Sequence, residues 1–125
     1  IVIYRSRLTR EPGVPDGSVG LGRPWHPTTT FADGRYADPR AVGQASFIDC
    51  HMDAHIHPEH WASMNGTARD GSKSDVFLPQ DSRFAESGSS GPGARSVDLG
   101  IKWKDAPGIE QFKMLFFEGW SIRQP

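Results

Sequence analysis

Glycine and proline interrupt this chain so often that long helices and strands have little room. Its 125 residues include 14 Gly and 10 Pro, and only 36% of the residues are apolar. Both residues favour turns and break regular elements. The composition therefore predicts an all-β fold of short strands joined by long, uneven loops.

Runs of β-branched, aromatic and apolar residues mark the expected strands. These runs cover residues 1–8, 18–21, 28–31, 44–50 and 82–87. Within 44–50, Ala45, Phe47 and Asp49 are expected to share one face. Residues 33–43 and 87–94 are expected to form loops, and 57–73 a polar excursion. Apolar spacing over 109–117 predicts one short helix near the carboxyl end, which Gly119 ends.

Charge and cysteine content exclude several classes of protein. The formal net charge is -1, and the cations are scattered rather than clustered, so neither nucleic-acid nor membrane binding is predicted. No apolar run reaches the length of a membrane span. Cys50 is the single cysteine, which leaves no intrachain disulfide and predicts a small buried side chain at the end of a strand.

The tetrad Gly22-Arg23-Pro24-Trp25 is the most informative local motif. In an extended segment, residues i and i+2 point to the same face, and proline keeps the link stiff. Arg23 and Trp25 should therefore stand side by side. A guanidinium binds carboxylates and an indole stacks on flat apolar faces, so the pair suits a sugar acid.

Four ordered blocks of sequence resemble the carboxyl-terminal half of bacterial pectin methylesterases. The blocks are Leu21-Gly22-Arg23-Pro24-Trp25 with residues 26–39 after it, residues 47–61, residues 81–86, and Ser90-Gly91-Pro92-Gly93-Ala94. The resemblance implies a right-handed parallel β-helix, of which residues 1–125 would form the carboxyl-terminal coils of one domain, without its amino-terminal coils. It also implies hydrolysis of galacturonate methyl esters in pectin, with release of methanol and without a cofactor.

The resemblance also implies roles for individual residues. Arg23 would hold the nucleophilic carboxylate ionised and aimed, Trp25 would stack on a sugar, and Thr28 and Met64 would line the substrate cleft. Trp61 would pack beneath that cleft. In the family, the two catalytic aspartates and the oxyanion glutamines precede the arginine. Here Glu11 and Asp16 are the only carboxylates before Arg23, and neither resembles those motifs.

The chain alone is therefore expected to carry half an active site and to be inactive. A fragment that binds pectin without hydrolysing it, and a β-helix relative acting on another ester or thioester, stay open as alternatives. The polymer substrate implies an extracellular or periplasmic protein, expected to be a monomer.

The remaining motifs favour structural roles. His51, His55, His57 and His60 crowd ten residues, but the family is metal-independent, so hydrogen-bonded histidines are expected rather than a metal site. His60 stands where the family commonly has glycine, which predicts an altered turn. Asn65-Gly66-Thr67 is a glycosylation sequon of the kind that arises by chance. Gly91-Pro92-Gly93 is expected to be a rigid turn that lets backbone segments pass closely.

Overall fold

The computed structural model describes residues 1–71, 74–94 and 114. Up to residue 94 the described chain is built from strands, with one short 3-10 helix, η1 (Pro79–Asp81). The strands are β1 (Val2–Tyr4), β2 (Arg7–Leu8), β3 (Thr28–Phe31), β4 (Gly34–Ala37), β5 (Gln44–Ile48), β6 (His51–Met52), β7 (Met64–Thr67), β8 (Ser74–Phe77) and β9 (Arg83–Ser87). The all-β prediction is confirmed for these residues, in which no helix has the length and apolarity needed to cross a bilayer.

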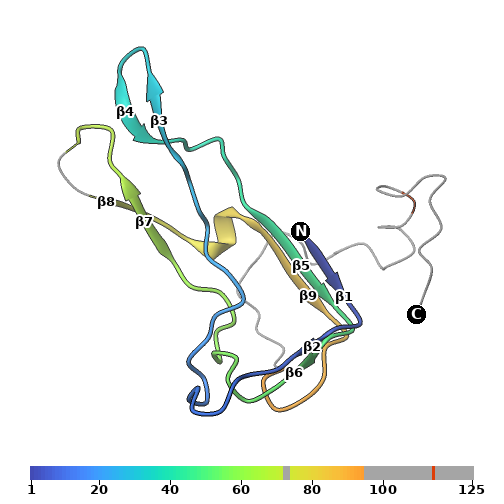
Figure 1. Cartoon of the computed structure of the whole chain (residues 1–125). Coiled ribbons are helices and arrows are strands. Elements are labelled where there is room, and N and C mark those ends of the chain that lie inside the picture. Colours follow the sequence, from blue (N-terminus) through green and yellow to red (C-terminus); the bar gives the residue numbers. More distant parts are fainter. Residues whose placement is uncertain (72–73, 95–113, 115–125) are drawn as a thin grey trace.

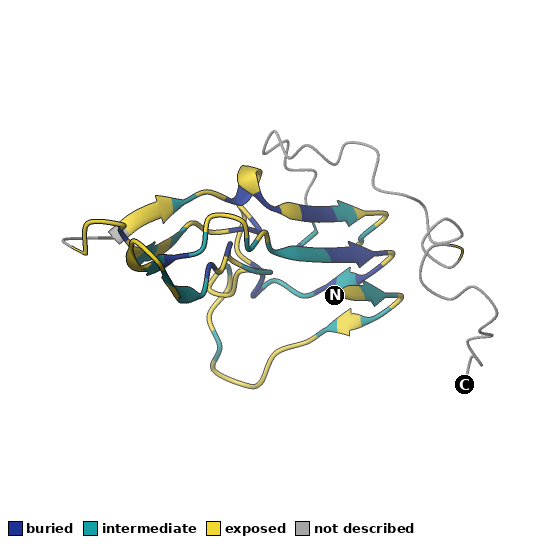
Figure 2. Cartoon of the chain, turned by 90° about the horizontal axis from the view of Figure 1, so that it is seen from above, coloured by how far each residue is buried: buried dark blue, intermediate teal, exposed yellow. Residues whose placement is uncertain are grey.

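Three passes of the chain stack on one another as parallel coils. Strands β1, β5 and β9 form one sheet in that order, with Tyr4 paired to Ile48 and Ile48 to Ser87. Strands β2 and β6 pair in parallel beyond a corner, and a bridge from His51 to Ser90 continues this second face. Figure 1 shows the three strands side by side, and Figure 2 shows them as layers seen from above. This is the predicted parallel β-helix; its right-handedness stays a prediction.

The same corner recurs in each pass, and it divides the first expected strand in two. Arg5, Asp49 and Gly88 have φ of 46°, 52° and 67°, the left-handed region. The amide of Arg5 donates to Ile48 O at 3.0 Å, and that of Asp49 donates to Ser87 O at 2.8 Å. The prediction of one strand over 1–8 was therefore wrong, because a left-handed residue turns the chain sharply between β1 and β2. Asp49 is exposed for the same reason and does not share the Phe47 face.

The core lies between the sheet faces. It contains Phe47, Cys50, Met52, Ile56, Trp61 and Phe84. The ring of Trp61 stacks on Phe84 with centroids 4.4 Å apart and meets Phe47 at 5.9 Å. Cys50 is fully buried, which confirms its reading as a small core side chain.

Two hairpins extend from one end of the coils (Figure 1). Strand β3 was predicted with its correct bounds, but residues 33–43 and 57–73 were wrongly assigned to irregular structure. Strand β4 pairs antiparallel with β3 across the two-residue turn Ala32-Asp33, and β7 pairs antiparallel with β8. The Asp33-Gly34 dipeptide was the available hairpin signal, because glycine accepts the φ of 143° found at Gly34.

The expected strand at 18–21 is reduced to single bridges, Val19 to Ile56 and Gly22 to Trp61. The helix expected at 109–117 lies outside the described residues, apart from Met114.

Gly93 allows two coils to approach closely, as the sequence predicted for its turn. A Cβ at this position would lie 2.3 Å from Asp53 O and 2.9 Å from Ile56 Cβ. Gly93→Ala is therefore expected to lower the free energy of unfolding by about 2–3 kcal/mol, the upper part of the range for overpacking. Urea denaturation measures this loss, with Gly20→Ala as the control, because a Cβ there meets nothing closer than 3.4 Å. Equal stability of the two variants would contradict the close approach.

Candidate functional site

Arg23 and Trp25 both reach solvent from the same extended segment. Arg23 is exposed and Trp25 is 63% exposed, whereas Pro24 and His26 between and after them are buried. This alternation is what an extended chain produces when every second residue faces inward. The sequence prediction that Arg23 and Trp25 share an outward face agrees with this pattern of burial.

Backbone pairing with the segment after His60 holds the tetrad in place. Gly22 and Trp61 form a parallel bridge, flanked by hydrogen bonds from Leu21 N to His60 O at 2.6 Å and from Ala62 N to Gly22 O at 3.1 Å. A Cβ on Gly22 would lie 3.2 Å from the Trp61 ring. Trp61 is 4% exposed, so it packs beneath the tetrad as expected and does not reach the surface.

Further along, His26 fixes the direction of the segment after Trp25. The imidazole of His26 stacks on Phe77 of β8 with centroids 3.8 Å apart, and its Nδ1 lies 2.7 Å from Asp38 O. No role was predicted for His26 from its neighbours in the sequence. Its contact with Phe77 depends on a hairpin that is distant along the chain, so no local signal pointed to it.

The structure places Thr28 and Met64 on the two hairpins that pack together. Thr28 begins β3, and its Oγ1 lies 3.1 Å from Oγ1 of Thr67 on β7. Met64 begins β7, is half-buried, and pairs with Phe77, the residue that stacks on His26. Trp25, Thr28 and Met64 thus lie on adjoining segments, and their assignment to substrate contact stays a prediction.

Arg23, like Arg7 and Arg35, has no hydrogen-bond or ion-pair partner among the described residues. Within residues 1–71 and 74–94, it makes no hydrogen bond and no ion pair. By contrast, Arg10 pairs with Asp16, Arg40 with Asp38 and Arg69 with Asp33. The exposed guanidinium of Arg23 is therefore available to a carboxylate outside the described residues, and its catalytic role stays a prediction.

The aspartates that follow the tetrad are occupied by the loops that carry them. Asp33 accepts a hydrogen bond from the Tyr36 hydroxyl at 3.2 Å and pairs with Arg69. Asp38 accepts from the amide of Arg40 at 2.9 Å. Neither arrangement sets up Asp33 or Asp38 as a nucleophile beside Arg23.

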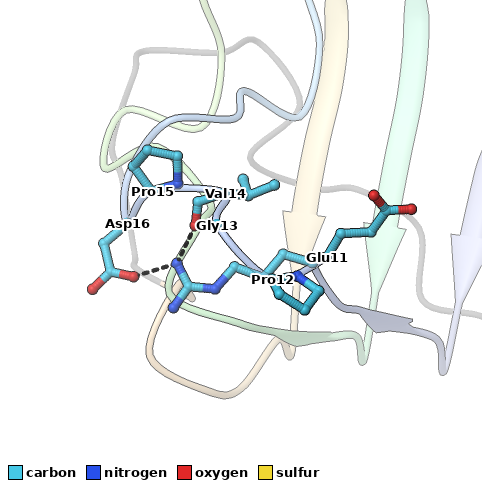
Figure 3. A pocket seen from close by; sticks show the side chains of 7 residues that line it. Glu11, Pro12, Gly13, Val14, Pro15 and Asp16 are labelled. Carbon is cyan, nitrogen blue, oxygen red and sulfur yellow. Dashed lines mark hydrogen bonds and ion pairs between the residues drawn. The ribbon is translucent and has the colours of Figure 1, made fainter.

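A hollow of about 500 Å³ lies in the loop from Arg10 to Asp16 and contains none of the predicted site residues. Figure 3 shows the labelled residues of this loop, Glu11 to Asp16, around the hollow, which Arg10 also lines. The Arg10 guanidinium donates a hydrogen bond to Val14 O at 2.8 Å and forms an ion pair with Asp16, so its charge is already neutralised within the loop. Glu11 and Asp16, the two carboxylates that precede Arg23, therefore belong to a loop with its own internal contacts.

The clustered histidines point in different directions. His55 and His60 are buried, whereas His57 is exposed and His51 lies 3.3 Å from Asp53. Across the described residues, no three His, Cys, Asp or Glu side chains are placed to hold a metal ion.

Stacked parallel coils with an outward arginine and tryptophan define part of a β-helix protein with a surface suited to an acidic carbohydrate. No family model matches the chain. Pectinesterase A of Dickeya chrysanthemi and that of Dickeya dadantii are each 54% identical over the whole chain, which corresponds to 34% of each relative. Among solved structures, a pectin methylesterase from Yersinia enterocolitica matches with a TM-score of 0.84 and 49% identity over 98% of this chain and 37% of its own. PemA from Erwinia chrysanthemi matches with a TM-score of 0.84 and 44% identity over 100% of this chain and 36% of its own.

Identity at this level along the full chain shows that it belongs to the pectin methylesterase family. The resemblance inferred from the sequence is thereby confirmed, together with the fold class. The chain spans about a third of the length of these relatives.

Proposed function

We propose that this chain is part of a pectinesterase, which hydrolyses galacturonate methyl esters in pectin and releases methanol. The observation that carries the proposal is the 54% identity over the whole chain to proteins named pectinesterase. Matched structures include a pectin methylesterase in complex with a hexasaccharide. The exposed Arg23 and Trp25 offer a cation and a stacking ring of the kind a galacturonate polymer requires.

The proposed reaction divides the work between this chain and residues outside it. One aspartate attacks the ester carbonyl to form an acyl-enzyme, glutamine side chains stabilise the oxyanion, and a second aspartate protonates the departing methanol. Water then cleaves the acyl-enzyme, which frees the galacturonate carboxyl group and regenerates the first aspartate. Arg23 keeps the first aspartate ionised and aimed through charge-assisted hydrogen bonds. Trp25 stacks on a sugar ring, and Thr28 and Met64 contact neighbouring sugars of the polymer.

The polymeric substrate also determines where the proposed enzyme acts. Pectin is a polymer that does not enter cells, so the protein acts outside the cell or in the periplasm, in cell-wall modification or pectin catabolism, as a monomeric aspartyl esterase. The chain would form the carboxyl-terminal coils of its β-helix. The 125-residue chain by itself is expected to release no methanol, because none of its residues is assigned the role of nucleophile.

The test is methanol release from methyl-esterified pectin by the protein that carries this chain. Trp25→Ala is expected to raise KM about tenfold, because a lost aromatic stacking contact is worth about 1 kcal/mol or slightly more. Trp25→Phe, which keeps a ring, is expected to restore most of the affinity. Pectin binding without methanol release by the unaltered protein would instead support the alternative of a non-catalytic binding protein.

A further inference from the structure

His60 is buried with both ring nitrogens occupied. Its side chain is 1% exposed, and its Nδ1 contacts Oε2 of Glu86 on β9. The other nitrogen, Nε2, lies 2.8 Å from the carbonyl oxygen of Gly93. The Glu86 side chain is itself only 15% exposed, so water contributes little to either group.

These contacts determine how many protons the pair must hold. A carbonyl oxygen only accepts hydrogen bonds, so Nε2 of His60 carries a proton and donates to Gly93. An ionised carboxylate also only accepts. Either Nδ1 carries a second proton and donates to Glu86, or Glu86 is protonated and donates to Nδ1. Both distributions place two protons on the pair, one more than a neutral histidine and an ionised carboxylate hold together.

The backbone of His60 connects this pair to the tetrad. His60 has φ of 59°, a left-handed conformation that costs a non-glycine residue free energy. Side-chain contacts must therefore hold the turn here. The carbonyl of His60 accepts from Leu21 N, and Ala62 two residues later donates to Gly22 O.

We propose that His60 and Glu86 form a two-proton bridge that positions the Arg23–Trp25 segment, and that loss of one of these protons releases this segment. The bridge makes His60 a positioning residue, because neither partner reaches the exposed face. Only its importance for pectin depends on the proposed function; the proton count and the backbone link do not.

Among the titratable side chains that the structure describes, His60 is the one whose charge affects the pKa of Glu86. Burial raises the pKa of Glu86, and the neighbouring His60 opposes this rise only in part. Of the other titratable side chains in residues 49–59, His51 lies beside Asp53, His55 is buried, and Asp49, His57 and Glu59 face solvent.

The sign of the pH dependence follows from the extra proton. In the unfolded chain a histidine loses its proton near pH 6.5, a typical value. Above that pH the folded pair holds one more proton than the unfolded chain, so stability falls as pH rises. The raised pKa of Glu86 acts in the same direction, since its stabilising contribution is present at low pH and lost as pH rises through the folded value. As long as the folded pair keeps this proton, the unfolding equilibrium constant is expected to increase up to about tenfold per pH unit above about pH 6.5.

Glu86→Gln should reverse this dependence. A glutamine amide donates to Nδ1, so a neutral His60 with one proton on Nε2 satisfies every contact. The folded variant then resists protonation, and its stability is expected to rise with pH between 5.5 and 7.5, opposite to the unaltered protein. His57→Gln is the matched control, because His57 is exposed and should leave the original dependence in place. Equal pH slopes for the Glu86→Gln and unaltered proteins would overturn the proposal.

NMR on the unaltered protein provides a test that needs no variant. Nitrogen shifts of the His60 ring and the carboxyl carbon shift of Glu86 are expected to report two protons on the pair at pH 7. Amide exchange at Leu21 and Ala62, corrected for intrinsic rates, should accelerate as the pair loses a proton. A single proton on the pair at pH 7, or unchanged protection after its loss, would overturn the bridge. No pectin is used in these measurements, so failure of the proposed enzyme activity would leave them interpretable.

Discussion

Arg23→Ala is expected to lower kcat for methanol release from methylated pectin by about 10² or more, with a smaller effect on KM. The structure leaves the Arg23 guanidinium exposed and without a hydrogen-bond or ion-pair partner among the described residues. In the proposed mechanism this cation orients an ionised carboxylate supplied by the rest of the enzyme. Loss of a charge-assisted contact at a reacting group has effects of this size in other enzymes.

Two control variants separate this role from general effects. Arg23→Lys keeps the charge but loses the planar fork, so partial activity is expected. Arg7→Ala removes an exposed arginine of β2 and should leave kcat unchanged. Near-normal turnover by Arg23→Ala, measured in the protein that carries this chain, would contradict the proposed role of Arg23.

Trp61→Ala is expected to lower the free energy of unfolding by about 3–5 kcal/mol, the usual cost of deleting a large buried ring. Trp61 is 4% exposed, stacks on Phe84 and bridges to Gly22, so the cavity would open directly beneath the tetrad. Activity should fall along with stability, because the same contacts hold Arg23 and Trp25 outward.

Trp25→Ala is the matched control for this effect, since it deletes the same side chain at a position that is 63% exposed. Its cost in urea denaturation is expected to be about 0.5 kcal/mol or less, as for most surface substitutions. Similar costs for the two tryptophans would mean that the core does not depend on the Trp61 stack.

Features that depend on neighbouring residues were predictable. The strand over 28–31 follows from three threonines and a phenylalanine, and the outward pair follows from the Arg23-Pro24-Trp25 spacing. The burial of Cys50 followed from its residue type. Strands β4 and β7 were missed because their residues are mostly polar or small, so antiparallel pairing rather than side-chain character makes them strands.

The sequence by itself determined the all-β class of the fold and the chemistry of the exposed pair, Arg23 and Trp25. Short strands, frequent turns and the stiff Arg-Pro-Trp link each depend on only a few consecutive residues. Only the tertiary structure decided what supports that pair. Stacking the coils brings Glu86 to His60, 26 residues away, and His26 to Phe77. Such contacts arise from the pitch and register of whole coils, which no local run of residues encodes.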